Sequence, residues 1–486
     1  MTRNHQFFIE EEAARCLLCA DAPCANPCKH GDPARALRAV RFGNADLAKQ
    51  WIASCSNDEL EAAEQACIHY DRPVRIRQIA ARLPELKPLD NPEPSLEIDF
   101  CGLHCENPFF LASSSVCTNY EMVARAFDAG WAGVYYKTIC LDDIVEVSPR
   151  FDAVPREGNH GDFGSFRNME QLSENPVEVD FDILRRLKRD YPSKIVVASI
   201  MGNTEEQWIE LAKMAEEAGV DAVELNFSCP QMRLAGMGSD VGQNPELVLF
   251  YTSHVKRAVA IPVIPKMTPN ITHINQPAMA SYFAGADAIS AINTIKSVTM
   301  SDSASVSGMK TISGLSGRAV KPIALRHIVE MAKNPVMKNI QFSGIGGIET
   351  WRDALEFIQV GCRNVQVCTA VMQYGYRIID DLILGLKHYM ASRGICHLSD
   401  LVGEQLSLFV PPSHLDRETM VFPVIDREKC IGCGRCYTSC NDAGHQAITF
   451  VDRKPQIVGK KCVGCHLCRL VCPTTAIGLA KRIPKK

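Results

Sequence analysis

Three features are absent from this sequence. It has no apolar run near the length of about 18 residues that a membrane-spanning helix needs. Its first 14 residues are polar and acidic, unlike a secretion signal, in which a basic segment precedes an apolar one. The net charge is −4, so no excess of basic residues would attract nucleic acid. We therefore expect a cytoplasmic protein with neither a membrane nor a nucleic-acid partner.

A dinucleotide-binding motif is missing as well. No G-x-G-x-x-G follows an expected strand and opens a helix, so we do not expect this chain to bind NAD or FAD directly. Cysteine, in contrast, is abundant, with 22 among 486 residues. In a reducing compartment, clustered thiols bind metals more often than they form disulfides. The positions of the cysteines therefore carry much of the information.

Eight cysteines near the C-terminus form two copies of C-x2-C-x2-C-x3-C. In this spacing three thiolates bind one iron–sulfur cluster and the fourth reaches the other cluster. We expect one [4Fe-4S] cluster on Cys430, Cys433, Cys436 and Cys472, and a second on Cys462, Cys465, Cys468 and Cys440. Two zinc sites are the alternative, but a third cysteine two residues after each C-x2-C pair is not typical of zinc ribbons.

A weaker cysteine run opens the chain. Cys16, Cys19, Cys24 and Cys28 form C-x2-C-x4-C-x3-C, which zinc or an incomplete ligand set would also fit. Cys67 lies downstream and could replace Cys28 as the fourth ligand. We expect one further iron–sulfur cluster here, because thiolates are soft ligands. The rest of residues 1–90 has a helical pattern.

Between the cysteine-rich ends, eight short apolar runs alternate with helical stretches. They end near Ser115, Thr138, Met201, Ser228, Thr268, Thr294, Gly346 and Ala370. Almost continuously apolar strands that alternate with helices predict a parallel sheet covered by helices, and eight such units predict an α/β fold of the (β/α)8 barrel type. A doubly wound sheet is the alternative. We expect a helical cysteine-rich segment over 1–90, the barrel over 91–410 and a ferredoxin-like domain over 411–486.

Polar residues gather at the expected C-terminal ends of the strands, where barrel enzymes place their active sites. Lys137 and Lys266 are poor core residues, because burying an unpaired charge is costly. Glycine-rich loops such as "SGLSG" and "SGIGGIE" would let backbone N–H groups approach a phosphate. Together these residues predict a phosphorylated flavin, with Lys266 steadying negative charge on the reduced ring.

From about residue 96 onward the chain resembles the dihydropyrimidine dehydrogenases: the catalytic subunit of the bacterial NAD-dependent enzyme and the C-terminal half of the mammalian one. The motifs that carry the resemblance include "NPFFLASS", "FRNMEQLSE", "ELNFSCPQM", "SGLSGRAVKPIALR", "VCTAVMQYGY" and the doubled cysteine run. The resemblance implies FMN in the barrel, two [4Fe-4S] clusters, and reversible reduction of the 5,6 double bond of uracil or thymine.

The resemblance also implies site residues. The implied FMN contacts are Ser113, Lys137, Thr138, Lys266, Gly317, Gly346, Gly347, Cys368 and Thr369. The implied substrate contacts are Asn168, Asn226, Phe227, Ser228, Asn293 and Thr294. Asparagine suits a pyrimidine, because its amide offers both an acceptor and donors to a ring of alternating C=O and N–H groups. For any one of these asparagines alone, capping of a turn would be the simpler interpretation.

The N-terminal 90 residues resemble a shortened form of the iron–sulfur segment that precedes the FAD and NAD(P) domains in this enzyme class. Those two domains have no counterpart here. We therefore expect a separate FAD- and NAD(H)-binding flavoprotein partner, a hetero-oligomer, and electrons that pass from NADH through the clusters to FMN.

Cys229 follows the fourth expected strand in "LNFSCPQ". An ordinary thiol is mostly protonated at neutral pH and can act as an acid without a shift in its pKa. We expect Cys229 to protonate C5 of the pyrimidine while a hydride reaches C6. A buried free thiol with no role is the alternative, and it is the usual fate of a lone cysteine.

Two other functions fit parts of the pattern. A dihydroorotate dehydrogenase would share the FMN barrel and the "N-x-S-C-P" loop, but its substrate carries a carboxylate, which Glu170 would disfavour. An electron-transfer subunit without catalysis would need only the cysteine runs, and the full set of polar strand ends argues against it.

Overall fold

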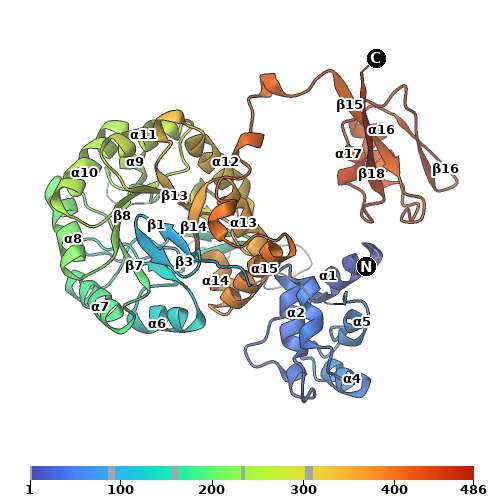
Figure 1. The fold of residues 1–486 in the computed structure, drawn as a ribbon, viewed down its shortest axis with the longest axis horizontal. Helices are drawn as coiled ribbons and strands as arrows, with labels where there is room; N and C mark the ends of the chain where they lie inside the picture. The colour runs from blue at the N-terminus through green and yellow to red at the C-terminus, as the bar shows by residue number, and fades with distance from the viewer. Residues whose placement is uncertain are drawn as a thin grey trace. The chain divides into compact units, whose positions relative to one another are not determined.

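The computed structural model describes residues 3–85, 93–155, 163–230, 232, 236–300 and 310–485 (Figure 1). Contacts divide the chain into two compact units. One unit consists of Phe42–Asn44 and Lys87–Phe409, and the other of Met1–Arg41, Ala45–Leu86 and Val410–Lys486. We describe each unit by itself. No helix in the described ranges is long and apolar enough to cross a bilayer.

The larger unit is built on a closed barrel of eight parallel strands. They are β3 (Phe109–Leu111), β4 (Gly133–Tyr135), β7 (Ile195–Ile200), β8 (Ala222–Asn226), β9 (Val263–Met267), β10 (Ala288–Ala291), β13 (Gln341–Ile345) and β14 (Cys362–Val367). The barrel closes where β14 pairs with β3, with Val365 opposite Phe109. All eight match the apolar runs of the sequence, so the (β/α)8 prediction is confirmed and the doubly wound alternative is wrong.

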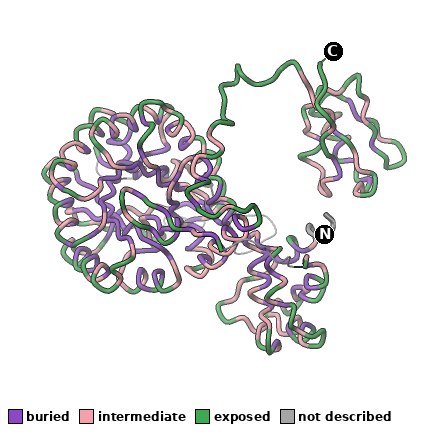
Figure 2. The backbone as a smooth tube through the Cα atoms, viewed as in Figure 1, coloured by how far each residue is buried: buried purple, intermediate pink, exposed green. Residues whose placement is uncertain are grey.

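Helices form a ring around these strands in Figure 1, and the strands form the buried centre in Figure 2. The larger helices are α6 (Tyr120–Ala129), α7 (Val177–Asp190), α8 (Glu205–Glu217), α10 (Pro245–Ala258), α11 (Asn275–Phe283), α12 (Lys321–Ala332), α13 (Trp351–Gln359) and α15 (Ile378–Ser392). Shorter ones are α9 (Ser239–Gly242) and α14 (Thr369–Tyr374). Several begin at capping side chains: Asn119 accepts the N–H of Met122, and Thr204 that of Gln207.

Two small sheets accompany the barrel, and the sequence reading did not include them. β1 (Ile98–Phe100) and β2 (Leu103–Cys105) form a hairpin. β5 (Phe151–Pro155), β6 (Phe163–Asn168), β11 (Ile295–Ser297) and β12 (Ser313–Ser316) form a four-stranded antiparallel sheet. Its strands belong to insertions that leave the C-terminal ends of β4 and β10. The sheet therefore lies at the end of the barrel where active sites are built.

The N-terminal segment is helical, as expected. It contains α1 (Arg3–Ala13), α2 (Pro33–Arg41), α3 (Ala45–Ala48), α4 (Asn57–Gln65) and α5 (Ile76–Ala80), with short 3-10 turns at Pro23–Ala25 and Lys49–Trp51. α4 starts with a reciprocal capping box, in which Ser56 and Glu59 bond to each other's backbone N–H groups. A local core that includes Ile9, Leu37, Ile76 and Ile79 holds these helices together.

The C-terminal domain pairs β15 (Thr419–Ile425) with β18 (Ile477–Pro484), and β16 (Ile448–Val451) with β17 (Lys454–Ile457). Its helices are α16 (Arg435–Ala443) and α17 (Leu467–Leu470). The fully buried core cluster is small and consists of Cys436, Ile448, Cys468 and Ile477. A domain of this size with so little apolar core depends on additional cross-links such as metal clusters.

Candidate active site and cysteine clusters

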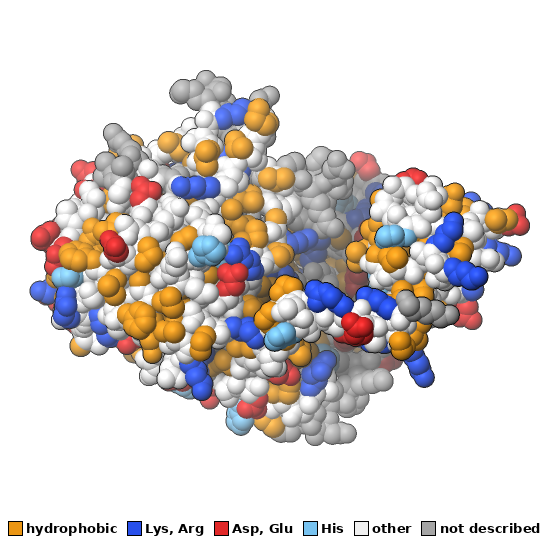
Figure 3. Space-filling model, turned by 90° about the horizontal axis from the view of Figure 1, so that it is seen from above, with side chains coloured by type: hydrophobic (Ala, Val, Ile, Leu, Met, Phe, Trp, Pro, Cys, Tyr) orange, Lys and Arg blue, Asp and Glu red, His pale blue; other side chains and the backbone are white. Residues whose placement is uncertain are grey.

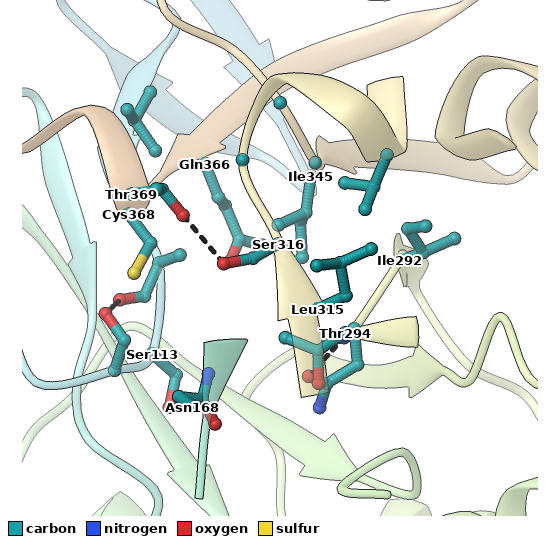
Figure 4. Close-up of a pocket in the computed structure, with 18 of the residues that line it drawn as sticks. Ser113, Asn168, Ile292, Thr294, Leu315, Ser316, Ile345, Gln366, Cys368 and Thr369 are labelled. Atoms are coloured by element: carbon teal, nitrogen blue, oxygen red, sulfur yellow. Dashed lines mark hydrogen bonds between the residues drawn. The ribbon is translucent and has the colours of Figure 1, made fainter. Parts of the chain in front are cut away.

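A cavity opens at the C-terminal end of the barrel (Figure 4). Most of the predicted site residues meet there, although they are far apart in the sequence. Those that line it are Ser113, Lys137, Thr138, Asn168, Asn226, Cys229, Lys266, Asn293, Thr294, Gly317, Gly346, Gly347, Cys368 and Thr369. The barrel brings them together because the C-terminal ends of parallel strands converge on one rim.

Phe227 and Ser228 are not among the residues that line the cavity in the described part of the chain. The Phe227 ring is fully buried against Trp208 of α8, with ring centroids 5.1 Å apart, because successive side chains point to opposite faces of a strand. Ser228 is also buried, and it acts on two neighbours: its hydroxyl donates to Asn226 Oδ1 at 2.8 Å and accepts from Asn293 Nδ2 at 2.9 Å. It thereby orients two amides that do line the cavity.

A chain of hydrogen bonds joins the two groups of predicted residues. The Thr138 hydroxyl lies 3.0 Å from Ser113 Oγ and 3.0 Å from Ser199 Oγ, and it accepts from Asn226 Nδ2 at 2.9 Å. Residues expected to contact the cofactor are thus bonded directly to a residue expected to contact the substrate. A network of this kind fixes the side-chain orientations before any ligand binds.

Both lysines of the cavity have carboxylate partners. Lys137 Nζ lies 3.2 Å from Glu170 Oε2, and the other oxygen of Glu170 lies 3.5 Å from Arg150. Lys266 Nζ lies 3.3 Å from Glu224 Oε1. Each lysine side chain is about 95 % buried, so an unpaired ammonium here would be costly. The cavity therefore presents paired positive charges, which can meet an anionic ligand without a large desolvation penalty.

The glycine-rich loops form one side of the cavity, where no side chain covers the backbone atoms. Gly317, Gly346 and Gly347 have φ values of +88°, +126° and +75°, which L side chains rarely adopt. A Cβ added to Gly347 would lie 2.8 Å from the carbonyl oxygen of Gly317. Beside this wall the Ser316 and Thr369 hydroxyls are 2.9 Å apart, as Figure 4 shows. Bare backbone, two lysines and the apolar side chains Ile292, Leu315 and Ile345 fit a phosphorylated flavin.

Cys229 is buried in the loop after β8 and lines the cavity. Its backbone carbonyl accepts the N–H of Ser239 at 2.9 Å. Gly238, at φ +57°, packs so closely that an added Cβ would lie 2.5 Å from that carbonyl. The start of α9 thus holds the backbone of Cys229 against the rim of the barrel.

Two polar residues of the site were missed at the sequence level. Glu224 and Gln366 lie within apolar strands and are fully buried, and Gln366 donates to Ser343 Oγ at 2.8 Å. A polar residue inside an apolar strand run was the available signal, because such a residue needs a buried partner. They were not among the predicted site residues because they lie inside the strands, whereas the prediction rested on residues at strand ends.

In the C-terminal domain, two cavities are each surrounded by four cysteines. One is lined by Cys430, Cys433, Cys436 and Cys472, and the other by Cys440, Cys462, Cys465 and Cys468. These are the two sets that the spacing predicted, including the exchange of the fourth ligand. Burial raises the pKa of the Cys436 thiol, and the neighbouring thiols Cys430, Cys433 and Cys472 add to the effect.

The N-terminal cysteines divide into two groups. Burial raises the pKa of Cys24 to about 12, and the nearby thiols of Cys16, Cys67 and Cys19 raise it further. Cys28 instead is buried and interacts with Cys55, whose pKa burial and that thiol raise to about 12. The structure therefore groups Cys67, and not Cys28, with the first three cysteines. Among the described residues, no three His, Cys, Asp or Glu side chains are close enough to hold a single metal ion.

The distribution of charged side chains on the surface is consistent with the small net charge of the chain. On the face drawn in Figure 3, acidic and basic side chains are mixed over the barrel, and neither sign forms a broad patch among the described residues.

Family models match two parts of the chain. A model described as dihydroorotate dehydrogenase matches residues 95–390, and a model described as a 4Fe-4S dicluster domain matches residues 423–479. The first covers the barrel with its cavity, and the second covers both cysteine-lined cavities of the C-terminal domain.

Individual relatives extend the match. The NAD-dependent dihydropyrimidine dehydrogenase subunit PreA of Escherichia coli K12 is 50 % identical over 394 residues, which are 79 % of this chain and 95 % of that protein. The chloroplastic dihydropyrimidine dehydrogenase (NADP(+)) of Arabidopsis thaliana is 39 % identical over 341 residues, 67 % of this chain and 79 % of that protein. The catalytic subunit of dihydroorotate dehydrogenase B (NAD(+)) of Pyrococcus abyssi is 34 % identical over 320 residues, 64 % of this chain and all of that protein. The chain therefore belongs to the dihydroorotate dehydrogenase family of barrel enzymes, with dihydropyrimidine dehydrogenases among its relatives.

Proposed function

We propose that this chain is the catalytic subunit of an NAD-dependent dihydropyrimidine dehydrogenase. It reduces the 5,6 double bond of uracil or thymine, reversibly, at an FMN in the barrel. The observation that carries the proposal is the meeting of three asparagines, two paired lysines and one cysteine around a single cavity. The 50 % identity to the PreA subunit supports the choice of reaction within the family.

The asparagines suit a neutral ring. Asn226 and Asn293 are linked through the Ser228 hydroxyl, so their amides are fixed in orientation, and Asn168 at the end of β6 also lines the cavity. Each amide offers donors and an acceptor to the alternating C=O and N–H groups of a pyrimidine. A ring that cannot return these hydrogen bonds leaves buried amides unpaired and is rejected.

The cofactor contacts form a second set around the same cavity. Lys266, Lys137, Thr138 and Ser113 would hold the flavin ring and its side chain, and Gly317, Gly346, Gly347, Cys368 and Thr369 the phosphate end. FMN, when bound, supplies hydride chemistry that no amino-acid side chain offers. The chain's own residues hold the pyrimidine against it and exclude water from the cavity.

Cys229 Sγ is proposed to give the proton to C5 of the pyrimidine as a hydride reaches C6. Cys229→Ala should keep FMN and the clusters but lose nearly all pyrimidine reduction, on the order of a thousandfold, because a general acid contributes about 10² to 10⁴ in rate. Cys140→Ala is the matched control, since Cys140 is also buried but does not line the cavity in the described part of the chain. Undiminished turnover in Cys229→Ala would exclude this role.

The cysteine groups are proposed to hold two [4Fe-4S] clusters and one further iron–sulfur cluster. Two lie in the C-terminal domain on the sets already given. For the third, the grouping of Cys16, Cys19, Cys24 and Cys67 supports these four as ligands, with Cys28 excluded. The chain would then contain three functional regions, over 1–90, 91–410 and 411–486.

Electrons are proposed to come from NADH through a separate FAD-containing flavoprotein in a hetero-oligomer, as the subunit status of PreA suggests. The test is to purify the chain with its partner and follow NADH oxidation with uracil, thymine, dihydroorotate and no substrate. Pyrimidine-dependent oxidation is expected.

A dihydroorotate dehydrogenase is the second candidate, favoured by the family model and by the 34 % identity to the catalytic subunit of dihydroorotate dehydrogenase B of Pyrococcus abyssi. Glu170 is about 91 % buried in its side chain and lies beside the proposed substrate position, which disfavours the carboxylate of dihydroorotate. Activity with dihydroorotate alone would overturn the proposal, and absence of any substrate-dependent flavin reoxidation would indicate an electron-transfer subunit.

A further inference from the structure

Glu224 is a fully buried carboxylate that lies beneath the cavity and does not line it in the described part of the chain. It lies on β8, two residues before Asn226, so both side chains point into the barrel. In the register of β8 and β9, Asn226 is opposite Lys266, which places Glu224 one layer below the lysine. The position is that of a support for Lys266 rather than of a ligand-binding group.

The contacts of Glu224 tie it to the cofactor side of the site. Its Oε1 lies 3.3 Å from Lys266 Nζ and accepts from Ser199 Oγ at 3.0 Å. Ser199 in turn lies 3.0 Å from Thr138 Oγ1. Within the described residues Oε2 has no hydrogen-bond partner. Burying an ionised carboxylate costs free energy unless a nearby cation compensates its charge, and the cation beside Glu224 is Lys266.

We propose that Glu224 is a positioning residue: it fixes the Lys266 ammonium beside the flavin and offsets its charge, and so keeps the reduction potential of FMN low. The inference rests on the proposed function, which places the flavin against Lys266. Lys266 alone would add one positive charge next to the ring and favour the reduced, anionic flavin. With Glu224 at 3.3 Å the pair is close to neutral, and the flavin remains a strong hydride donor.

The proposal predicts both the direction and the size of the changes in flavin potential and sulfite affinity. Glu224→Gln removes the negative charge but keeps the shape and the hydrogen bond from Ser199. The charge of Lys266 is then unbalanced, so the midpoint potential of FMN should become more positive. Sulfite, which adds to N5 of oxidised flavin as an anion, should bind about tenfold more tightly or better, because the same charge stabilises the adduct. A merely structural role for Glu224 would move neither quantity.

The experiment uses the holoenzyme with FMN bound and measures the flavin potential in a dye-equilibrated titration. The sulfite dissociation constant is measured in parallel from bleaching of the flavin band, without any pyrimidine. Asp180→Asn is the matched control, since Asp180 is another fully buried carboxylate and does not line the cavity in the described part of the chain, so both quantities should stay near the wild-type values. Glu224→Asp keeps the charge but withdraws it from Lys266, so its shift should have the same sign and be smaller.

An FMN-containing Glu224→Gln enzyme with wild-type potential and sulfite affinity would overturn the inference. If Glu224→Gln does not fold or loses FMN, the Glu224→Asp variant provides the test. A wild-type flavin potential and sulfite affinity in Glu224→Asp would then overturn the inference. A wild-type chain that binds no flavin at all would instead overturn the proposed function.

Discussion

The barrel and the cysteine-rich ends gather their functional residues in different ways. In the barrel, residues from strands as far apart in the sequence as β3 and β14 meet, because every strand ends on the same rim. In the C-terminal domain, each four-cysteine set comes from two stretches of chain fewer than 45 residues apart, and a repeated local spacing brings them together. The first arrangement depends on the whole fold and the second mainly on the loops.

The N-terminal segment shows what happens when the local spacing is irregular. Its first three cysteines follow one another closely, but the fourth member of the group is Cys67, beyond α4, and not the nearer Cys28. Cys28 follows a 3-10 turn, Pro23–Ala25, and its side chain is buried in the local core. A regular cysteine repeat therefore predicts which thiols lie together, whereas in an irregular one the packing of helices determines the last member of the group.

The largest effect is expected where the spacing is regular. Cys440→Ser should remove the second cluster of the C-terminal domain, because Cys440 crosses over to the set of Cys462, Cys465 and Cys468. We expect NADH-driven pyrimidine reduction to fall by about a hundredfold or more, with the iron content lower by one cluster, while chemically reduced enzyme still reduces the pyrimidine. Cys396→Ser, at an exposed cysteine, is the control and should change none of these. Full iron content in Cys440→Ser would refute the exchange of ligands.

A matched pair of variants tests the irregular segment. Cys67→Ser should lose the iron of one cluster, whereas Cys28→Ser should keep all of it. The hydroxyl placed in the buried site of Cys28 should only lower the free energy of unfolding of the segment, by about 1–3 kcal/mol. Iron analysis and electron paramagnetic resonance of the reduced protein measure the first effect, and thermal unfolding the second. The reverse pattern, with iron lost only from Cys28→Ser, would show that the nearer cysteine is the ligand.

The smallest effect is expected in the barrel, where the backbone itself forms part of the site. Gly347→Ala places a side chain at φ +75° and 2.8 Å from the Gly317 carbonyl, at a strain of about 1–2 kcal/mol. FMN should bind about tenfold more weakly, as measured by equilibrium fluorescence quenching. Gly219→Ala has similar strain at φ +79°, with no atom within 4 Å of the added Cβ, and it lies away from the cavity. Equal loss of FMN affinity in both variants would mean that Gly347 has no special place near the cofactor.

Much of the site could be predicted from the sequence because strand ends are visible as the last residues of apolar runs. Lys137, Asn226, Lys266 and Asn293 were found in this way and line the cavity. Phe227 was included only because the resemblance implied it, and it does not line the cavity in the described part of the chain, since its ring packs against Trp208. The four-stranded sheet that carries Asn168 was not predicted, because β11 and β12 are short and β12 pairs with β6, a strand of a different insertion.

The sequence by itself determined the eight barrel strands, the doubled cysteine set and the composition of the rim, because each depends on periodicity or spacing within a short stretch of chain. Only the tertiary structure shows that Cys67 lies near Cys24 and that Glu224 pairs with Lys266. The physical reason is the same in both cases. A buried thiol or carboxylate must find its partner across the packed interior, and that partner is set by which elements lie side by side and not by sequence distance.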